Sequence, residues 1–104
     1  MKIKVTYHSD PGHGWFAVKL ADIDAAGLAD KISQYSYKRG QTVYLEEDSD
    51  APRFFRAIDR SKLDIKYAKF QERSPVRSYN SYTYEKLEVI YEWVVSWHPV
   101  VECV

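Results

Sequence analysis

The sequence predicts an α+β fold, an antiparallel sheet of four to six strands with two helices packed on one face. Residues 2–8 alternate polar and apolar side chains with the two-residue period of a half-buried strand, and residues 42–47 repeat that alternation. Residues 50–58 instead place three apolar side chains on one side of a helix. Turn residues rich in Asp, Pro and Gly separate the periodic segments. With 104 residues, the chain is expected to form a single domain, residues 1–104, around one hydrophobic core.

The first two strands are expected to form a hairpin. Residues 9–14 interrupt the alternation with the chemistry of a tight turn, and a short strand at residues 15–20 follows. Asp10 can accept hydrogen bonds from the backbone ahead of it, the proline fixes one φ, and the two glycines permit positive φ. Such a hairpin would anchor Trp15 in the core.

A short helix and a second hairpin are expected next. Residues 21–28 have the pattern of one or two helical turns that end at Gly27, a residue suited to the left-handed conformation that closes many helices. Residues 32–37 and 42–47 have the pattern of two hairpin arms with Gly40 at their turn.

The clearest helix lies within residues 46–63. Asp48, Ser49 and Asp50 are natural helix caps, and Pro52 suits a first helical turn. At about 100° per residue, an apolar stripe and an arginine stripe fall on different faces of this helix. The apolar stripe comprises Phe54, Phe55 and Ile58, and the arginine stripe comprises Arg53, Arg56 and Arg60.

Residues 65–72 are expected to form a further strand, and residues 73–82 an irregular segment rich in Ser, Arg and Tyr. For residues 86–97, a strand places the apolar side chains on one face, whereas a helix scatters them around its axis, so a strand is favoured. This apolar face would be a hazard at an exposed edge, which points to a central strand or the seam of a homodimer. Residues 85–104 are therefore expected to form a C-terminal strand extension.

The charge is balanced overall but uneven along the chain. The formal net charge is zero, which argues against nucleic-acid binding by bulk charge. Residues 52–86 carry nine Lys and Arg against four Asp and Glu, and so form a basic band between two mildly acidic segments. The lone cysteine cannot form an internal disulfide, and no stretch has the pattern of a signal peptide or a membrane span. The expected compartment is the cytoplasm, with no membrane association.

Metal binding and catalysis are the first functions to weigh for the histidine-containing turn. His8, Asp10 and His13 offer nitrogen and oxygen ligands, with His98 or Cys103 as further ligands from the other end of the chain. No close pair has the spacing that metal sites use, and no serine or thiol carries a nucleophile motif. A turn with incidental histidines is the favoured interpretation, so we expect a protein that is not an enzyme and uses no cofactor.

Arginine and tyrosine side chains are the favoured candidates for a binding surface. The arginine stripe suits the acidic patch of a protein partner or the phosphates of a nucleic acid, but it also fits a plain solvated helix face. The irregular segment adds arginines and spaced tyrosines, which are enriched in protein interfaces but equally fit rings buried within the domain. Neutral net charge favours a protein partner over nucleic acid. The candidate binding residues are Arg53, Arg56, Arg60, Arg73, Arg77, Tyr79 and Tyr82.

Five short motifs stand out, namely HGW (13–15), ADKIS (29–33), YSY (35–37), VYLEED (43–48) and SPVRSY (74–79). Through these motifs, roughly residues 1–82 resemble a group of small proteins from bacteriophage and prophage genomes. The resemblance implies an origin on a mobile element and expression in a bacterial cytoplasm. By analogy with small phage accessory proteins, the protein is expected to bind or inhibit a host protein, such as a defence nuclease. It implies no catalytic residues. The chain departs from the usual pattern after Tyr82, where similar proteins often stop.

Overall fold

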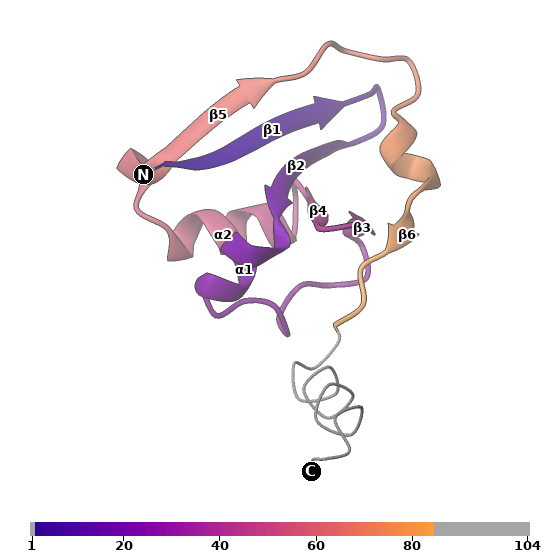
Figure 1. Ribbon diagram of the computed structural model, residues 1–104. Coiled ribbons are helices and arrows are strands. Elements are labelled where there is room, and N and C mark those ends of the chain that lie inside the picture. Colours follow the sequence, from indigo (N-terminus) through magenta and orange to yellow (C-terminus); the bar gives the residue numbers. More distant parts are fainter. Residues whose placement is uncertain (1, 85–104) are drawn as a thin grey trace, which may run out of the picture.

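The computed structural model describes residues 2–84 and confirms the α+β fold class (Figure 1). Within these residues, six strands form one sheet in the order β5-β1-β2-β4-β3-β6. The predicted strand at residues 86–97, the extension at residues 85–104 and the homodimer seam lie outside the described residues. In chain order the elements are β1 (Ile3–Ser9), β2 (Gly14–Lys19), α1 (Leu20–Ala25), β3 (Tyr37–Arg39), β4 (Thr42–Glu46), α2 (Asp50–Ala57), the 3₁₀ turn η1 (Arg60–Lys62), β5 (Leu63–Tyr67), the 3₁₀ turn η2 (Pro75–Ser78) and β6 (Asn80–Ser81).

Both helices lie on the same face of the sheet and bury the main hydrophobic core against it (Figure 1). Because side chains alternate along a strand, Val5, Val18 and Leu45 point to this face. Ile23 of α1 and Phe54 of α2 join them, and all five side chains are buried. The predicted packing of two helices on one face is therefore confirmed.

The β1–β2 hairpin forms as predicted, with Tyr7 opposite Phe16 and His8 opposite Trp15. At its turn, one oxygen of the Asp10 carboxylate accepts hydrogen bonds from the main-chain N–H groups of the second and third residues ahead, at 3.0 and 3.1 Å. Trp15 is buried, as predicted, but the alternation places it on the sheet face opposite the helices.

The two glycines of this turn have a different role from the predicted one, because positive φ is found at neither of them. Gly14 lies against the Tyr7 ring and Gly12 against the Arg77 guanidinium. A Cβ at either position would overlap that neighbour. Both glycines therefore provide space for a side chain rather than an unusual backbone conformation.

The helix α1 ends as predicted. Gly27 has a φ of 74°, and the N–H of Leu28 donates to the carbonyl of Ile23 at 3.1 Å. This arrangement satisfies a carbonyl at the helix end that would otherwise lack a partner. Neither α1 nor α2 has the length and apolar character that a helix needs to cross a membrane.

The second hairpin is shorter than predicted. Gly40 has a φ of 60° and makes the expected turn, but β3 begins only at Tyr37. Residues 32–36, predicted as most of the first arm, adopt irregular turns. Ser33 and Ser36 explain the difference, because their hydrogen bonds to a carboxylate of α2 compete with strand pairing.

That carboxylate belongs to Asp50, which was predicted to cap α2. Asp50 is buried and accepts hydrogen bonds from the Ser33 N–H at 3.0 Å and from the Ser33 and Ser36 hydroxyls at 2.7 and 2.5 Å. The Ser36 oxygen in turn accepts the N–H of Glu46 at 3.0 Å. One side chain thus joins the turn before β3, the end of β4 and the start of α2.

The strand after α2 runs parallel to its neighbour, which corrects the prediction of a fully antiparallel sheet. β5 pairs with β1 from Leu63 opposite Ile3 to Tyr67 opposite Tyr7. The chain leaves β4, crosses the helical face through α2 and re-enters the sheet beyond β2 and β1 (Figure 1). A helical crossover returns the chain to the same end of the sheet, so the two strands it connects are parallel. The strand also begins and ends earlier than the predicted residues 65–72.

The segment after β5 carries the chain from one edge of the sheet to the other. The N–H of Ala68 donates to the Tyr7 carbonyl at 2.9 Å, and the chain then passes the β1–β2 turn and reaches β3 through η2 and β6 (Figure 1). The predicted irregular segment at residues 73–82 therefore contains a 3₁₀ turn and a short edge strand.

We predict that Ser36→Ala lowers the free energy of unfolding by about 1–3 kcal/mol, because a buried carboxylate and a main-chain N–H each lose a partner. Urea unfolding followed by circular dichroism measures this change. The matched control is Ser81→Ala on β6, an exposed position where a change within about 0.5 kcal/mol is expected. Equal stability of the two variants would contradict the role assigned to the Asp50 network.

Candidate functional site

A groove of about 440 Å³ lies at the end of the sheet where β2 and β3 begin and β4 ends. Its volume falls in the range of sites that hold a small ligand or a few side chains. We call it the aromatic groove. Its lining residues are His13, Trp15, Gln34, Tyr35, Tyr37, Glu46, Asp48 and Ser49.

Strand pairing brings the central residues of the aromatic groove together. Trp15 of β2 pairs with Glu46 of β4. Tyr37 of β3 pairs with Tyr44, which lies on β4 two residues before Glu46. Paired residues share a face, so Trp15, Glu46 and Tyr37 all lie on the sheet face opposite the helices. Tyr35 comes from the turn before β3 and is 67% exposed.

The rings of the aromatic groove contact one another. The centroids of Trp15 and Tyr37 are 6.2 Å apart at an interplanar angle of 69°, and those of His13 and Trp15 are 5.9 Å apart. The contact of Trp15 with Tyr37 is edge-to-face, a favourable arrangement that helps to hold the two rings in place, whereas the His13 ring is tilted against Trp15. Trp15 is only 2% exposed and forms the base of the groove, with the guanidinium carbon of Arg77 lying 5.5 Å from its ring centroid.

Two carboxylates border the aromatic groove. One Glu46 oxygen accepts the Asp48 N–H and the Ser49 hydroxyl, both at 3.0 Å, which fixes the carboxylate at the end of β4. Asp48 is exposed. Within residues 2–84, the ion pairs are Asp10 with Arg77 and Asp30 with Lys31, so neither of these two groove carboxylates has a cationic partner there.

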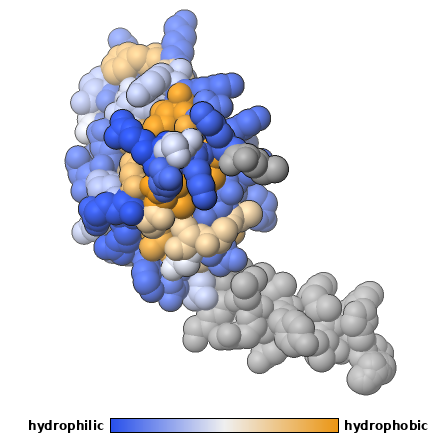
Figure 2. All heavy atoms as spheres, turned by 90° about the vertical axis from the view of Figure 1, so that its left-hand side faces the viewer, coloured by the Kyte–Doolittle hydropathy of each residue, from blue (hydrophilic) through white to orange (hydrophobic). Residues whose placement is uncertain are grey.

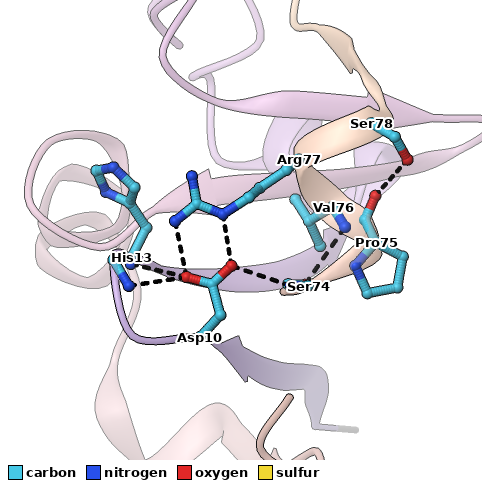
Figure 3. A network of polar contacts seen from close by, with 8 residues as sticks. Asp10, His13, Ser74, Pro75, Val76, Arg77 and Ser78 are labelled. Atoms are coloured by element: carbon cyan, nitrogen blue, oxygen red, sulfur yellow. Dashed lines mark hydrogen bonds and ion pairs between the residues drawn. The ribbon is translucent and has the colours of Figure 1, made fainter. Parts of the chain in front are cut away.

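A partly buried ion pair between Asp10 and Arg77 lies next to the base of the groove, and Figure 3 shows its hydrogen bonds. The Asp10 carboxylate accepts the Nε and Nη2 groups of Arg77 at 2.5 and 2.8 Å and the main-chain N–H of Ser74 at 3.0 Å. Two further N–H groups of the hairpin turn bring the total to five hydrogen bonds. The hydrogen bonds from Arg77 are the main reason why the pKa of Asp10 is held well below its usual range, and the same bonds raise the pKa of Arg77.

The predicted arginine stripe is divided between two elements. Arg53 and Arg56 lie on α2, but that helix ends at Ala57 because Ile58 is extended, and Arg60 belongs to η1. All three arginines are exposed, and Arg53 donates to the carbonyl of Lys31. On the side of the molecule where α2 leads into β5, hydrophilic side chains surround and interrupt the hydrophobic ones (Figure 2). This side has the character of a solvated surface.

The other predicted binding residues do not share a surface with the arginine stripe. Arg77 is held by Asp10, and Tyr82 is buried in the helix-side core with its hydroxyl bonded to the Ala29 carbonyl, so both have internal roles. Tyr79 packs against Tyr44, which the alternation places on the opposite sheet face. Arg73 is exposed before η2. The predicted set is therefore spread over both faces of the sheet.

The candidate metal ligands near the turn do not converge within the described residues. Nowhere in residues 2–84 do three or more His, Cys, Asp or Glu side chains group together as a metal site requires. Asp10 is occupied by Arg77 and the backbone, and His8 is half-buried, which lowers its pKa. His13 lines the aromatic groove instead. His98 and Cys103, the remaining candidates, lie outside the described part of the chain.

The sequence analysis did not find the aromatic groove. Its residues come from three separate stretches, and a turn that looked like a strand carries Tyr35. The available signal was the pair of YSY and VYLEED motifs, whose aromatic and acidic residues meet across the second hairpin. Comparison of the chain with family models, curated proteins and solved structures gives no match.

We predict that Asp10→Asn makes the protein less stable at neutral pH and less sensitive to acid. The folded-state pKa of Asp10 lies below its unfolded value of about 4, so the carboxylate stabilises the fold fully above that pH. This contribution is lost progressively as the pH falls below about 4, because the unfolded state then binds a proton more readily.

Urea midpoints of the wild type and Asp10→Asn between about pH 7 and pH 2 measure this effect. Asp24→Asn, which removes an exposed carboxylate from α1, is the control and should keep the acid sensitivity of the wild type. Parallel pH profiles for the wild type and Asp10→Asn would show that the ion pair does not govern the acid response.

Proposed function

We propose that the protein is a non-enzymatic accessory protein of the phage type that binds a host protein in the bacterial cytoplasm and inhibits it. The observation that carries this proposal is the aromatic groove, a recess with an exposed tyrosine at its rim. Tyr and Trp are enriched at the centres of protein interfaces because they provide large, rigid contact areas. The resemblance to phage proteins points in the same direction.

The rim of the aromatic groove is held in place before any partner arrives. The Tyr35 N–H donates to the Ser33 hydroxyl at 3.2 Å, and that hydroxyl donates to the buried Asp50 carboxylate at 2.7 Å. The backbone that presents the exposed ring is therefore tied to α2. A binding surface that is already ordered loses less conformational entropy on association, which supports specific recognition by a domain of this size.

A second candidate function is nucleic-acid binding at the β5 edge of the sheet. Tyr67 and Phe70 are 76% and 58% exposed, and the exposed side chains of Lys66 and Lys69 lie beside them in the sequence. Aromatic rings that alternate with basic side chains can stack bases and neutralise phosphates. The neutral net charge makes this the weaker of the two candidates.

For the favoured function, we predict that tagged full-length protein captures one bacterial protein from host lysate. Tyr35→Ala should lower the affinity for that protein by at least about tenfold, as expected for an interface hot spot. Mass spectrometry identifies the partner, and calorimetry with the two purified proteins measures the affinity. The Arg53→Ala/Arg56→Ala/Arg60→Ala variant is the control and should bind like the wild type, because its changes lie on α2 and η1.

The opposite pattern, with binding lost in the arginine variant and kept in Tyr35→Ala, would move the interface to α2 and η1. Failure of the wild type to retain any bacterial protein under gentle conditions would count against the protein-binding function as a whole.

For the second candidate, fluorescence anisotropy with a labelled single-stranded oligonucleotide provides the test. Nucleic-acid binding predicts affinity that falls steeply between about 50 and 200 mM salt and a loss of affinity in Lys66→Ala/Lys69→Ala. Tyr35→Ala should have no effect on this activity. Equal binding of the oligonucleotide by the wild type, the lysine variant and the triple arginine variant would remove this function.

A further inference from the structure

We propose that the aromatic groove binds the guanidinium group of an arginine side chain on the partner protein. The inference rests on the proposed function, since it names the chemistry that the partner would present to the same groove. Three properties of the groove carry it, namely its charge, its rings and its dimensions.

The charge of the aromatic groove favours a cation. Glu46 and Asp48 border it, and within residues 2–84 neither forms an ion pair. The Glu46 carboxylate is fixed by the Asp48 N–H and the Ser49 hydroxyl, and an oxygen held by neutral donors keeps its full negative charge. A ligand with a carboxylate or phosphate would be repelled, whereas a cation gains charge-assisted hydrogen bonds.

The rings of the aromatic groove favour a planar cation. Tyr35 and Tyr37 line the recess beside the buried Trp15, and the face of an aromatic ring attracts a cation through its quadrupole. The chain itself already makes this contact twice, with Arg77 at 5.5 Å from the Trp15 centroid and Arg39 at 5.2 Å from the Tyr79 centroid. A guanidinium both stacks on rings and forms paired hydrogen bonds with a carboxylate, which an ammonium group does less well.

The dimensions of the groove favour a side chain over a larger ligand. A recess of about 440 Å³ lies near the lower end of the range for small-molecule sites. It is open to solvent on one side, where Tyr35 is exposed. A long side chain from a partner surface can therefore enter with its polar end between the rings and the carboxylates, while its backbone stays outside.

The test is an NMR titration of the full-length protein with N-acetyl-arginine methylamide, using N-acetyl-citrulline methylamide as an uncharged probe of the same shape. We expect the arginine probe to give saturable shifts of the Trp15 indole N–H and the Tyr35 and Tyr37 amides. The citrulline probe should give shifts at least about fivefold weaker at equal concentration, because it lacks the charge that the rings and carboxylates recognise.

Conservative variants locate the interaction. Glu46→Gln and Asp48→Asn should each weaken binding of the arginine probe by about two- to fivefold, because each removes one negative charge. Tyr35→Leu should weaken binding by a similar factor, because it removes the aromatic ring while it keeps an apolar side chain. The Gln side chain can still accept from the Asp48 N–H, so the loop is preserved. Asp24→Asn on α1 makes the same charge change outside the groove and should leave the affinity unchanged.

Equal binding of the arginine and citrulline probes, or shifts that lie away from the groove, would overturn the inference. A captured partner that needs Tyr35 but binds equally well to wild type, Glu46→Gln and Asp48→Asn would overturn it as well, while the proposed function stands. If the arginine probe binds as expected but no bacterial protein is captured, the guanidinium site is supported and the proposed function fails.

Discussion

The ion pair between Asp10 and Arg77 is the constraint on which the far side of the sheet depends. It joins a hairpin turn near the start of the chain to a 3₁₀ turn 67 residues later, with five hydrogen bonds converging on one buried carboxylate. Burying a charged carboxylate is costly, and it is sustained only where its oxygens have hydrogen-bond partners. Here the pairing fixes the course of residues 68–79 and places a guanidinium over Trp15. The N–H of Gln71, which donates to the Ser9 carbonyl at 3.4 Å, and the contact of the Tyr79 and Tyr44 rings add to this attachment.

A second buried carboxylate has the equivalent role on the helical side. Asp50 holds the turn at residues 33–36 through two serines, and that turn also carries the exposed Tyr35. The aromatic groove lies between the two carboxylate networks, with its base supported by the Asp10 network and its rim by the Asp50 network. The Asp50 network uses short side chains and main-chain N–H groups, which have little conformational freedom to lose. Hydrogen bonds to the two carboxylates thus support the groove at both its base and its rim.

Features set by neighbouring residues could be predicted from the sequence, whereas features set by contacts between distant residues could not. The β1–β2 hairpin, the end of α1 at Gly27 and the turn at Gly40 were predictable because periodicity and turn chemistry act over a few residues. The parallel direction of β5 was not, since it depends on which strand a helical crossover reaches. Arg77 was assigned to a binding surface because a charge is usually solvated, and its ion pair with Asp10, 67 residues earlier in the chain, could not be read from local sequence. The aromatic groove was missed for the same reason, as its residues meet only when β2, β3 and β4 pair.

The long return from β5 to β6 also has a kinetic consequence. Each hairpin closes a short loop, whereas the β1–β5 pairing and the contacts of η2 close loops that span most of the described chain, and closing a loop costs more entropy as it lengthens. The hairpins can therefore assemble first, and the wrapping segment can dock last. Contacts that form after the rate-limiting step govern how fast a protein unfolds rather than how fast it folds. The contacts of residues 68–79 would then determine the unfolding rate, and so how long the folded state persists.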